Sequence, residues 1–124
     1  MKSSGILNAE LARVIAALGH GDLLVIGDAG LPVPPGVPCI DLAVTLGVPG
    51  FLDVLDAVLS EMCVETACRA SEAGEIGAQM DARLTCTHVS HDAFKAQSTQ
   101  AIAVVRTGEA TPYANIALRA GVVF

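Results

Sequence analysis

His20 and Asp28 are the two residues near the start of the chain whose types suit proton-transfer chemistry. They flank a short apolar run, residues 23–26, which is bounded by glycine and predicts a buried strand. Asp28 follows that strand, and groups at the carboxyl end of a buried strand line the ligand crevice of α/β folds. Histidine gains and loses a proton near neutral pH, and a carboxylate can orient its ring. The alternative is a turn histidine and a strand-end aspartate that never meet.

A second group of candidate residues lies in the segment 86–91, which contains Cys86, His88 and His91. These residue types suit zinc, but no second Cys or His cluster follows at the spacing of a zinc finger. We therefore expect no metal site. We expect instead that one histidine of the segment enters a pocket.

A third candidate group follows Pro112 and contains Tyr113, Ala114 and Asn115. Tyrosine and asparagine together offer the donors and acceptors that the hydroxyl groups of a sugar require. The alternative is a tyrosine at the start of a strand with an ordinary turn asparagine beside it.

Several common catalytic and cofactor patterns are missing from the chain. There is no G-x-G-x-x-G after a strand, no G-x-x-x-x-G-K-[ST] and no G-x-S-x-G. These absences leave nucleotide binding and a serine nucleophile without support, and we expect no cofactor.

The elements that must position these residues follow from the apolar periodicity and the turn formers. Helices are expected at 9–18, from Pro49 to 59 and after Ser90, which can cap a short helix. Strands are expected at 23–26, 39–43, 61–66, 83–88, 101–105 and 113–118. Residues 30–38 hold four prolines and predict a stiff loop, and residues 69–82 predict a surface loop or a short helix. Residues 122–124 are expected at a sheet edge or a subunit contact. The alternation predicts an α/β fold, which we expect to be a three-layer α/β/α domain with a mixed, mostly parallel sheet.

The bulk composition limits the classes of function. A chain of 124 residues is long enough for one domain, expected to span 1–124, but too short for two. A net charge of −6 with only seven Lys and Arg residues argues against a nucleic-acid partner. No signal-peptide pattern and no membrane-length apolar run are visible, so we expect no membrane contact, a cytoplasmic location and reduced cysteines.

Several stretches, taken together, resemble the D-ribose pyranase family, which is related to the L-fucose mutarotases. The matching pieces are Leu18–Asp22, Asp28–Pro34, Ile40–Ala43, Gly47–Pro49, Glu61–Met62, Val64–Glu65, His91 with Phe94–Lys95, Thr107–Glu109, Pro112–Ile116 and Ala120–Val122. They occur in the family's order over nearly the whole chain. Family members usually have a longer segment where this chain has residues 69–82, so His88 remains a rival to His91.

The resemblance implies that His20 is the catalytic acid–base residue and that Asp28, His91 and the segment Tyr113-Ala114-Asn115 bind the sugar. It implies that free D-ribose is converted between its pyranose and furanose forms without a metal or cofactor. It also implies a homo-oligomer, generally a decamer of two stacked pentamers, with sites where subunits meet.

Three other functions remain open at this point. The first is a non-catalytic sugar-binding or regulatory subunit associated with pentose transport. The second is a mutarotase acting on another sugar such as L-fucose, and the third is a metal protein that uses Cys86, His88 and His91.

Overall fold

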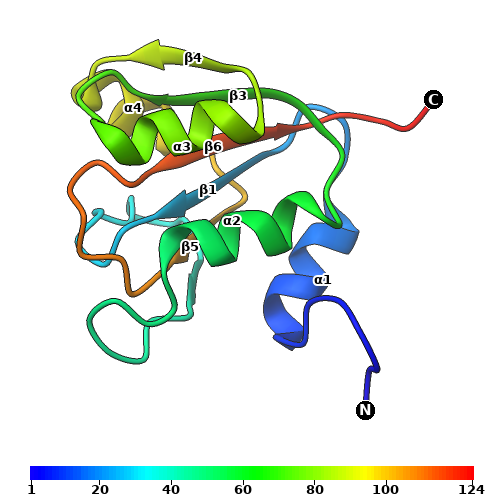
Figure 1. The fold of residues 1–124 in the computed structure, drawn as a ribbon. Coiled ribbons are helices and arrows are strands. Elements are labelled where there is room, and N and C mark those ends of the chain that lie inside the picture. The colour runs from blue at the N-terminus through cyan, green and yellow to red at the C-terminus, as the bar shows by residue number, and fades with distance from the viewer.

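The computed structural model describes all residues, 1–124, and consists of one six-stranded sheet with four helices (Figure 1). The helices are α1 (Ala9–Ala17), α2 (Phe51–Leu59), α3 (Glu75–Arg83) and α4 (His91–Ser98). The strands are β1 (Leu23–Gly27), β2 (Cys39–Asp41), β3 (Val64–Ala70), β4 (Cys86–Val89), β5 (Ala103–Arg106) and β6 (Ile116–Ala120). None of these four helices could span a membrane.

The strands lie in the order β2-β5-β1-β6-β3-β4. β6 is antiparallel to both of its neighbours, β1 and β3, while the other pairs are parallel. The sheet is therefore mixed and mostly parallel, as predicted.

The same topology gives the sheet two distinct ends. The carboxyl ends of β1, β3, β4 and β5 share one end with the start of β6, and the starts of β1 and β3 share the other with its finish.

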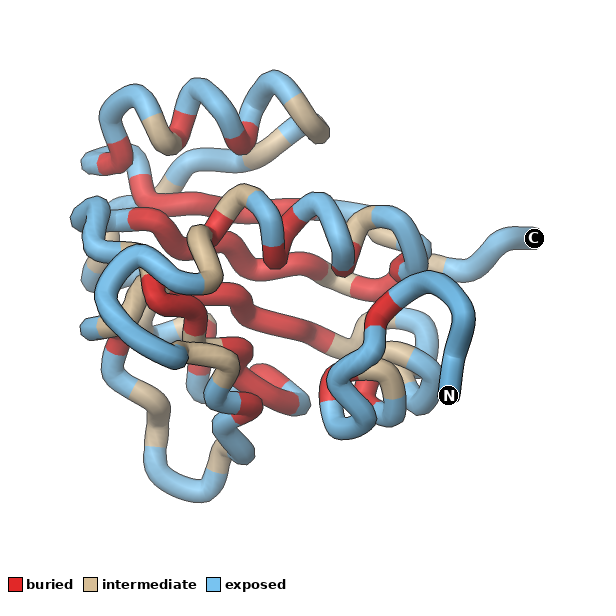
Figure 2. The backbone as a smooth tube through the Cα atoms, turned by 60° about the horizontal axis from the view of Figure 1, so that its bottom comes forward, coloured by how far each residue is buried: buried red, intermediate tan, exposed pale blue.

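Alternation along β1 explains the two hydrophobic cores. Leu24 and Ile26 pack into the larger core with apolar residues of α1, α2 and α3, whereas Leu23 and Val25 pack into a smaller core with Phe94 of α4. Helices thus cover both faces of the sheet, which confirms the three-layer prediction. Figure 2 shows the central strands as the most continuously buried part of the chain.

The predicted strand 61–66 was placed too early. α2 continues into a turn in which the Met62 amide donates to the Val58 carbonyl, and β3 begins only at Val64. Met62 and Val64, whose alternation predicted the strand, therefore belong to different elements: Met62 to the turn after α2 and Val64 to the start of β3. The predicted loop or short helix at 69–82 proves to be the end of β3 followed by α3, which extends to Arg83.

Several other boundaries also differ from the predictions. β4 begins at Cys86 and not at residue 83, because Arg83 is the last residue of α3, and β2 ends two residues early, at Asp41. Pro49 does not open a helix, because α2 begins at Phe51 after Gly50. β5 and β6 begin two and three residues later than predicted, at Ala103 and Ile116, which leaves Tyr113 in the turn before β6.

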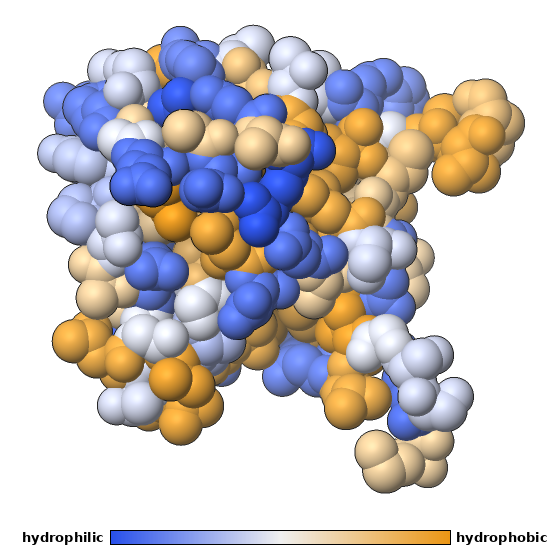
Figure 3. Space-filling view, viewed as in Figure 1, coloured by the Kyte–Doolittle hydropathy of each residue, from blue (hydrophilic) through white to orange (hydrophobic).

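Exposed apolar side chains gather in two segments. One is the loop that contains Val44, Leu46 and Val48, and the other is the C-terminal tail, residues 122–124. Figure 3 shows the tail projecting from the body of the molecule. The tail forms no strand, and nothing within the chain covers its last two side chains.

Candidate functional site

Asp28 and Asn115 meet at one end of the sheet because their strands are neighbours that run in opposite directions. Asp28 directly follows β1, and Asn115 directly precedes β6. The Asp28 backbone N–H donates to the Asn115 side-chain oxygen over 2.9 Å. The Gly27 carbonyl beside them accepts from both the amide and the hydroxyl of Thr107, which fixes the end of β1.

Two buried polar atoms at this end have no hydrogen-bond partner within the chain. They are Nδ2 of Asn115 and Nδ1 of His91. Asn115 is fully buried, and leaving a buried donor unpaired costs about 1–3 kcal/mol. A structure that retains two such atoms at one end of the sheet is suited to a ligand that carries hydroxyl groups, since a hydroxyl both donates and accepts.

Tyr113 lies against His91. Their rings meet edge to face with centroids 5.0 Å apart, and the His91 ring also lies parallel to that of Phe94 at 6.4 Å. Tyr113 has a φ of 62°, the left-handed region that a bulky residue rarely adopts. The turn that follows buries Ala114 completely and brings Asn115 beside Asp28. Strain of this kind is typical of ligand-binding turns.

Glu72 fixes the position of His91 through a contact that was not predicted from the sequence. His91 is the first residue of α4, where Ser90 caps the helix by accepting from the Ala93 amide, as predicted. Both carboxylate oxygens of Glu72 accept from the His91 backbone N–H, at 2.9 and 3.0 Å. This hydrogen bond lowers the pKa of Glu72.

Glu109 is a second residue that sequence reasoning missed. Its Oε1 accepts from the Phe51 amide at the start of α2, and its Oε2 accepts from Thr111. The Phe51 hydrogen bond is the main cause that lowers the Glu109 pKa. The Glu109 carbonyl also accepts from the Ala29 amide, next to Asp28. Glu109 therefore joins the loop before β6, the loop after β1 and helix α2.

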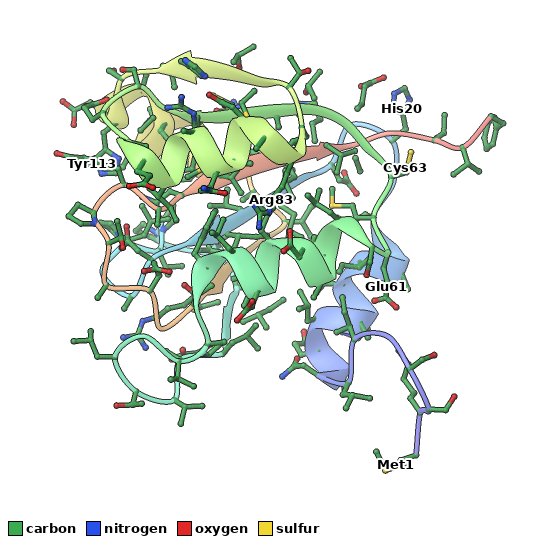
Figure 4. All side chains as sticks on the ribbon, in the orientation of Figure 1. Met1, His20, Glu61, Cys63, Arg83 and Tyr113 are labelled. Atoms are coloured by element: carbon green, nitrogen blue, oxygen red, sulfur yellow. The ribbon has the colours of Figure 1, made fainter.

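His20 lies at the opposite end of the sheet from Asp28. It occupies the turn between α1 and β1, and its ring contacts the carboxylate of Glu65 at the start of β3. Six residue steps from Asp22 to Asp28, at about 3.3 Å each, put about 20 Å between the two ends. Figure 4 shows His20 and Tyr113 on opposite sides of the molecule. Within a single chain Asp28 therefore does not orient the His20 ring, and the alternative in which the two residues do not meet describes the structure.

The structure separates the two rival histidines. The His88 ring contacts Asp81 of α3, at 3.3 Å, whereas His91 contacts Tyr113. Cys86 donates its thiol hydrogen to the Leu84 carbonyl, and burial raises its pKa to about 11. Cys86 and His88 both lie near Asp81, whereas His91 contacts Tyr113, and the chain contains no group of three or more potential metal ligands.

One end of the sheet therefore carries the sugar-binding candidates: Asp28, His91, Tyr113, Ala114 and Asn115. It offers a carboxylate, an imidazole nitrogen, an amide donor and an aromatic ring, all suited to binding a polyhydroxylated molecule. The proton-transfer candidate, His20, lies at the other end.

Comparisons with known proteins identify the family of this chain. A model of the RbsD / FucU transport protein family matches residues 1–123. The D-ribose pyranases of Bacillus licheniformis and Variovorax paradoxus are 51% and 55% identical to this chain, over 131 and 132 residues that cover all of both proteins. Both alignments are longer than the 124 residues of this chain, so some positions of the relatives have no counterpart here.

Solved structures show the same relationship. Bacillus subtilis RbsD, solved in complex with D-ribose, superposes with a TM-score of 0.94 at 45% identity, and all of both chains is covered. The fucose mutarotase of Streptococcus pneumoniae, in complex with L-fucose, gives 0.80 at 26% identity over 95% of each chain. With its whole length matched in sequence and in fold, the chain belongs to the RbsD / FucU transport protein family.

Proposed function

We propose that this chain is a D-ribose pyranase, an isomerase that converts free D-ribose between its pyranose and furanose forms. Full-length identity of about half with D-ribose pyranases supports this function. The structural observation that carries it is the pair of unpartnered buried atoms, Nδ2 of Asn115 and Nδ1 of His91, at the same end of the sheet as the Asp28 carboxylate. Sugar hydroxyls would satisfy both atoms.

The chemistry of the reaction requires only proton transfer. His20 delivers a proton to the ring oxygen O5 while the anomeric hydroxyl loses its proton to water or a neighbouring polar group. The C1–O5 bond breaks, and the open-chain aldehyde forms. After rotation of the chain, O4 attacks C1, O4 loses its proton and the aldehyde oxygen gains one, which closes the furanose. No electron is gained or lost overall, so acid–base groups suffice.

The complete site requires two copies of the chain. A single copy holds its sugar-binding residues and His20 about 20 Å apart, too far for both to touch one pentose. We therefore propose that His20 of one copy meets Asp28, His91 and Tyr113 of another within a homo-oligomer. The family resemblance favours a cytoplasmic decamer of two stacked pentamers, and the exposed apolar tail and 44–48 loop offer surface for subunit contacts.

Exchange NMR on D-ribose labelled with 13C at C1 tests the function. The protein should speed exchange between the pyranose and furanose signals above the buffer rate. His20→Ala should reduce this acceleration by about 100-fold or more while ribose still binds. His88→Ala is the matched control, since the His88 ring contacts Asp81 and is not one of the proposed site residues, and it should behave as the wild type.

Other outcomes would support other functions. Unchanged exchange with ribose still bound would show a non-catalytic sugar-binding subunit. Acceleration of L-fucose anomer exchange without acceleration for ribose would show a fucose mutarotase, the activity named for the Streptococcus pneumoniae relative.

A further inference from the structure

The turn that contains His20 is hydrogen-bonded to the end of β6. The Gly21 amide donates to the Ala120 carbonyl over 2.8 Å, and the Arg119 guanidinium donates to the Gly21 carbonyl over 2.7 Å. Gly21 has a φ of +88°, which favours glycine. The place of His20 is thus set by two consecutive residues of β6.

The two neighbours of Glu65 in β3 pair with the same two residues of β6. In the β3–β6 pairing, Val64 is opposite Ala120 and Thr66 is opposite Arg119, which leaves Glu65 as the extra residue of a bulge. Bulges change the direction in which a side chain points and often lie next to active sites. Space here is restricted, because a Cβ on Gly121 would lie 3.1 Å from the Glu65 Cβ.

The bulge brings the Glu65 carboxylate to His20. Glu65 Oε1 lies 3.1 Å from His20 Nε2, and both side chains are about half exposed, at 49% and 57%. An exposed pair of this kind contributes little to folding stability. The bulge that creates the contact is therefore better explained by the hydrogen-bond partner that it provides for the His20 imidazole.

We propose that Glu65 is a positioning residue for His20, an inference that rests on the proposed acid–base role of His20. A neutral imidazole has one protonated nitrogen, and a hydrogen bond at one nitrogen fixes the state of the other. Glu65 accepts from Nε2–H and holds the ring in one orientation. Nδ1 is then the nitrogen that exchanges a proton with the sugar: it takes a proton from solvent, delivers that proton to O5 and returns to the neutral state, while Nε2–H stays bonded to Glu65.

Two substitutions at Glu65 separate orientation from charge. Glu65→Ala removes the acceptor and should lower the exchange rate at saturating ribose about tenfold, less than the loss of His20 itself. Ribose affinity should change little, because Glu65 bonds to the His20 ring and is not one of the proposed sugar-binding residues. Glu65→Gln keeps an oxygen that can accept from Nε2–H and should restore most of the rate. Glu61→Ala is the control, since it removes the same charge four residues away without touching His20.

Nitrogen NMR of 15N-histidine-labelled protein reports on the pair independently of activity. A ring held in one tautomer keeps its two nitrogen shifts widely separated. That separation should narrow in Glu65→Ala and persist in Glu65→Gln, with the His20 signals identified from His20→Ala.

The outcomes distinguish this inference from the proposed function. A wild-type protein that fails to speed ribose exchange contradicts the function, whatever the nitrogen shifts show. An active Glu65→Ala protein with wild-type rate and shifts overturns the positioning role. A Glu65→Gln rate as low as that of Glu65→Ala also overturns it, because negative charge rather than a hydrogen-bond acceptor would then be required.

Discussion

Gly27→Ala tests how closely the end of β1 is packed against the candidate site. A Cβ at this position would lie 2.5 Å from Cδ2 of Leu31 and 3.0 Å from Oδ1 of Asn115. Carbon atoms normally approach to about 3.5 Å, so Leu31 must move by about 1 Å or Asn115 must give way. The backbone cannot shift freely, since the Gly27 carbonyl accepts two hydrogen bonds from Thr107.

The expected cost follows from two opposing terms. Overpacking a buried site costs about 1–3 kcal/mol. Replacing glycine by alanine restricts the unfolded chain and returns about 0.4–1 kcal/mol. The net loss is about 1–2 kcal/mol, or a fall of about 4–8 °C in the midpoint of thermal unfolding for a chain of this size. Ribose affinity should fall as well, because the displaced Asn115 belongs to the proposed sugar site.

Gly30→Ala is the matched control for this prediction. Its Cβ would meet only the Asp28 carboxylate, at an ordinary 3.6 Å, and Gly30 does not have a positive φ. We expect wild-type or slightly raised stability. Thermal unfolding of both variants at one protein concentration, followed by circular dichroism, gives the comparison. A Gly27→Ala protein as stable as Gly30→Ala, with unchanged ribose affinity, would refute the packing argument.

Two further predictions concern carboxylates. The Arg69 guanidinium donates to both Asp81 oxygens, at 3.0 and 2.7 Å, and holds the pKa of Asp81 well below its usual range. The ion pair stabilises the fold at a pH above the unfolded pKa of about 4, and this stability is lost as the pH falls toward the folded pKa. Asp81→Asn should therefore be less stable at neutral pH. Its urea midpoint should also decline less steeply below about pH 4 than that of the wild type. Glu109→Ala removes the acceptor for the Phe51 amide at the start of α2 and should lower the free energy of unfolding by about 1 kcal/mol, measured by urea titration at pH 7, whereas an unchanged midpoint would contradict this capping role.

Local sequence signals correctly predicted the elements that depend on neighbouring residues. The apolar run before Asp28 is a buried strand, and Ser90 caps the helix that begins with His91. Placing Asp28 at the carboxyl end of β1 also put it on the end of the sheet where Asn115 lies. These results need only periodicity, capping chemistry and the direction of a strand.

The contacts that fix the side chains were beyond local reasoning. Glu72 and His91 are 19 residues apart, and Glu109 and Phe51 are 58 residues apart. The contact between Glu65 and His20 depends on a bulge in β3 against β6. The predicted strand 61–66 covered only the first residues of β3, which continues to Ala70, so it could not indicate this pairing. Strand order decides which carboxylate reaches which partner, and a single sequence carries no direct signal for it.

The separation of His20 from Asp28 along β1 has a thermodynamic consequence for the proposed enzyme. Each chain can fold around its own cores and still hold no complete site, so folding and the appearance of activity become separate equilibria. Activity per chain then depends on total protein concentration, because dilution below the subunit dissociation constant removes sites without unfolding any chain. A cell that makes too little of this protein would possess folded molecules and no catalyst.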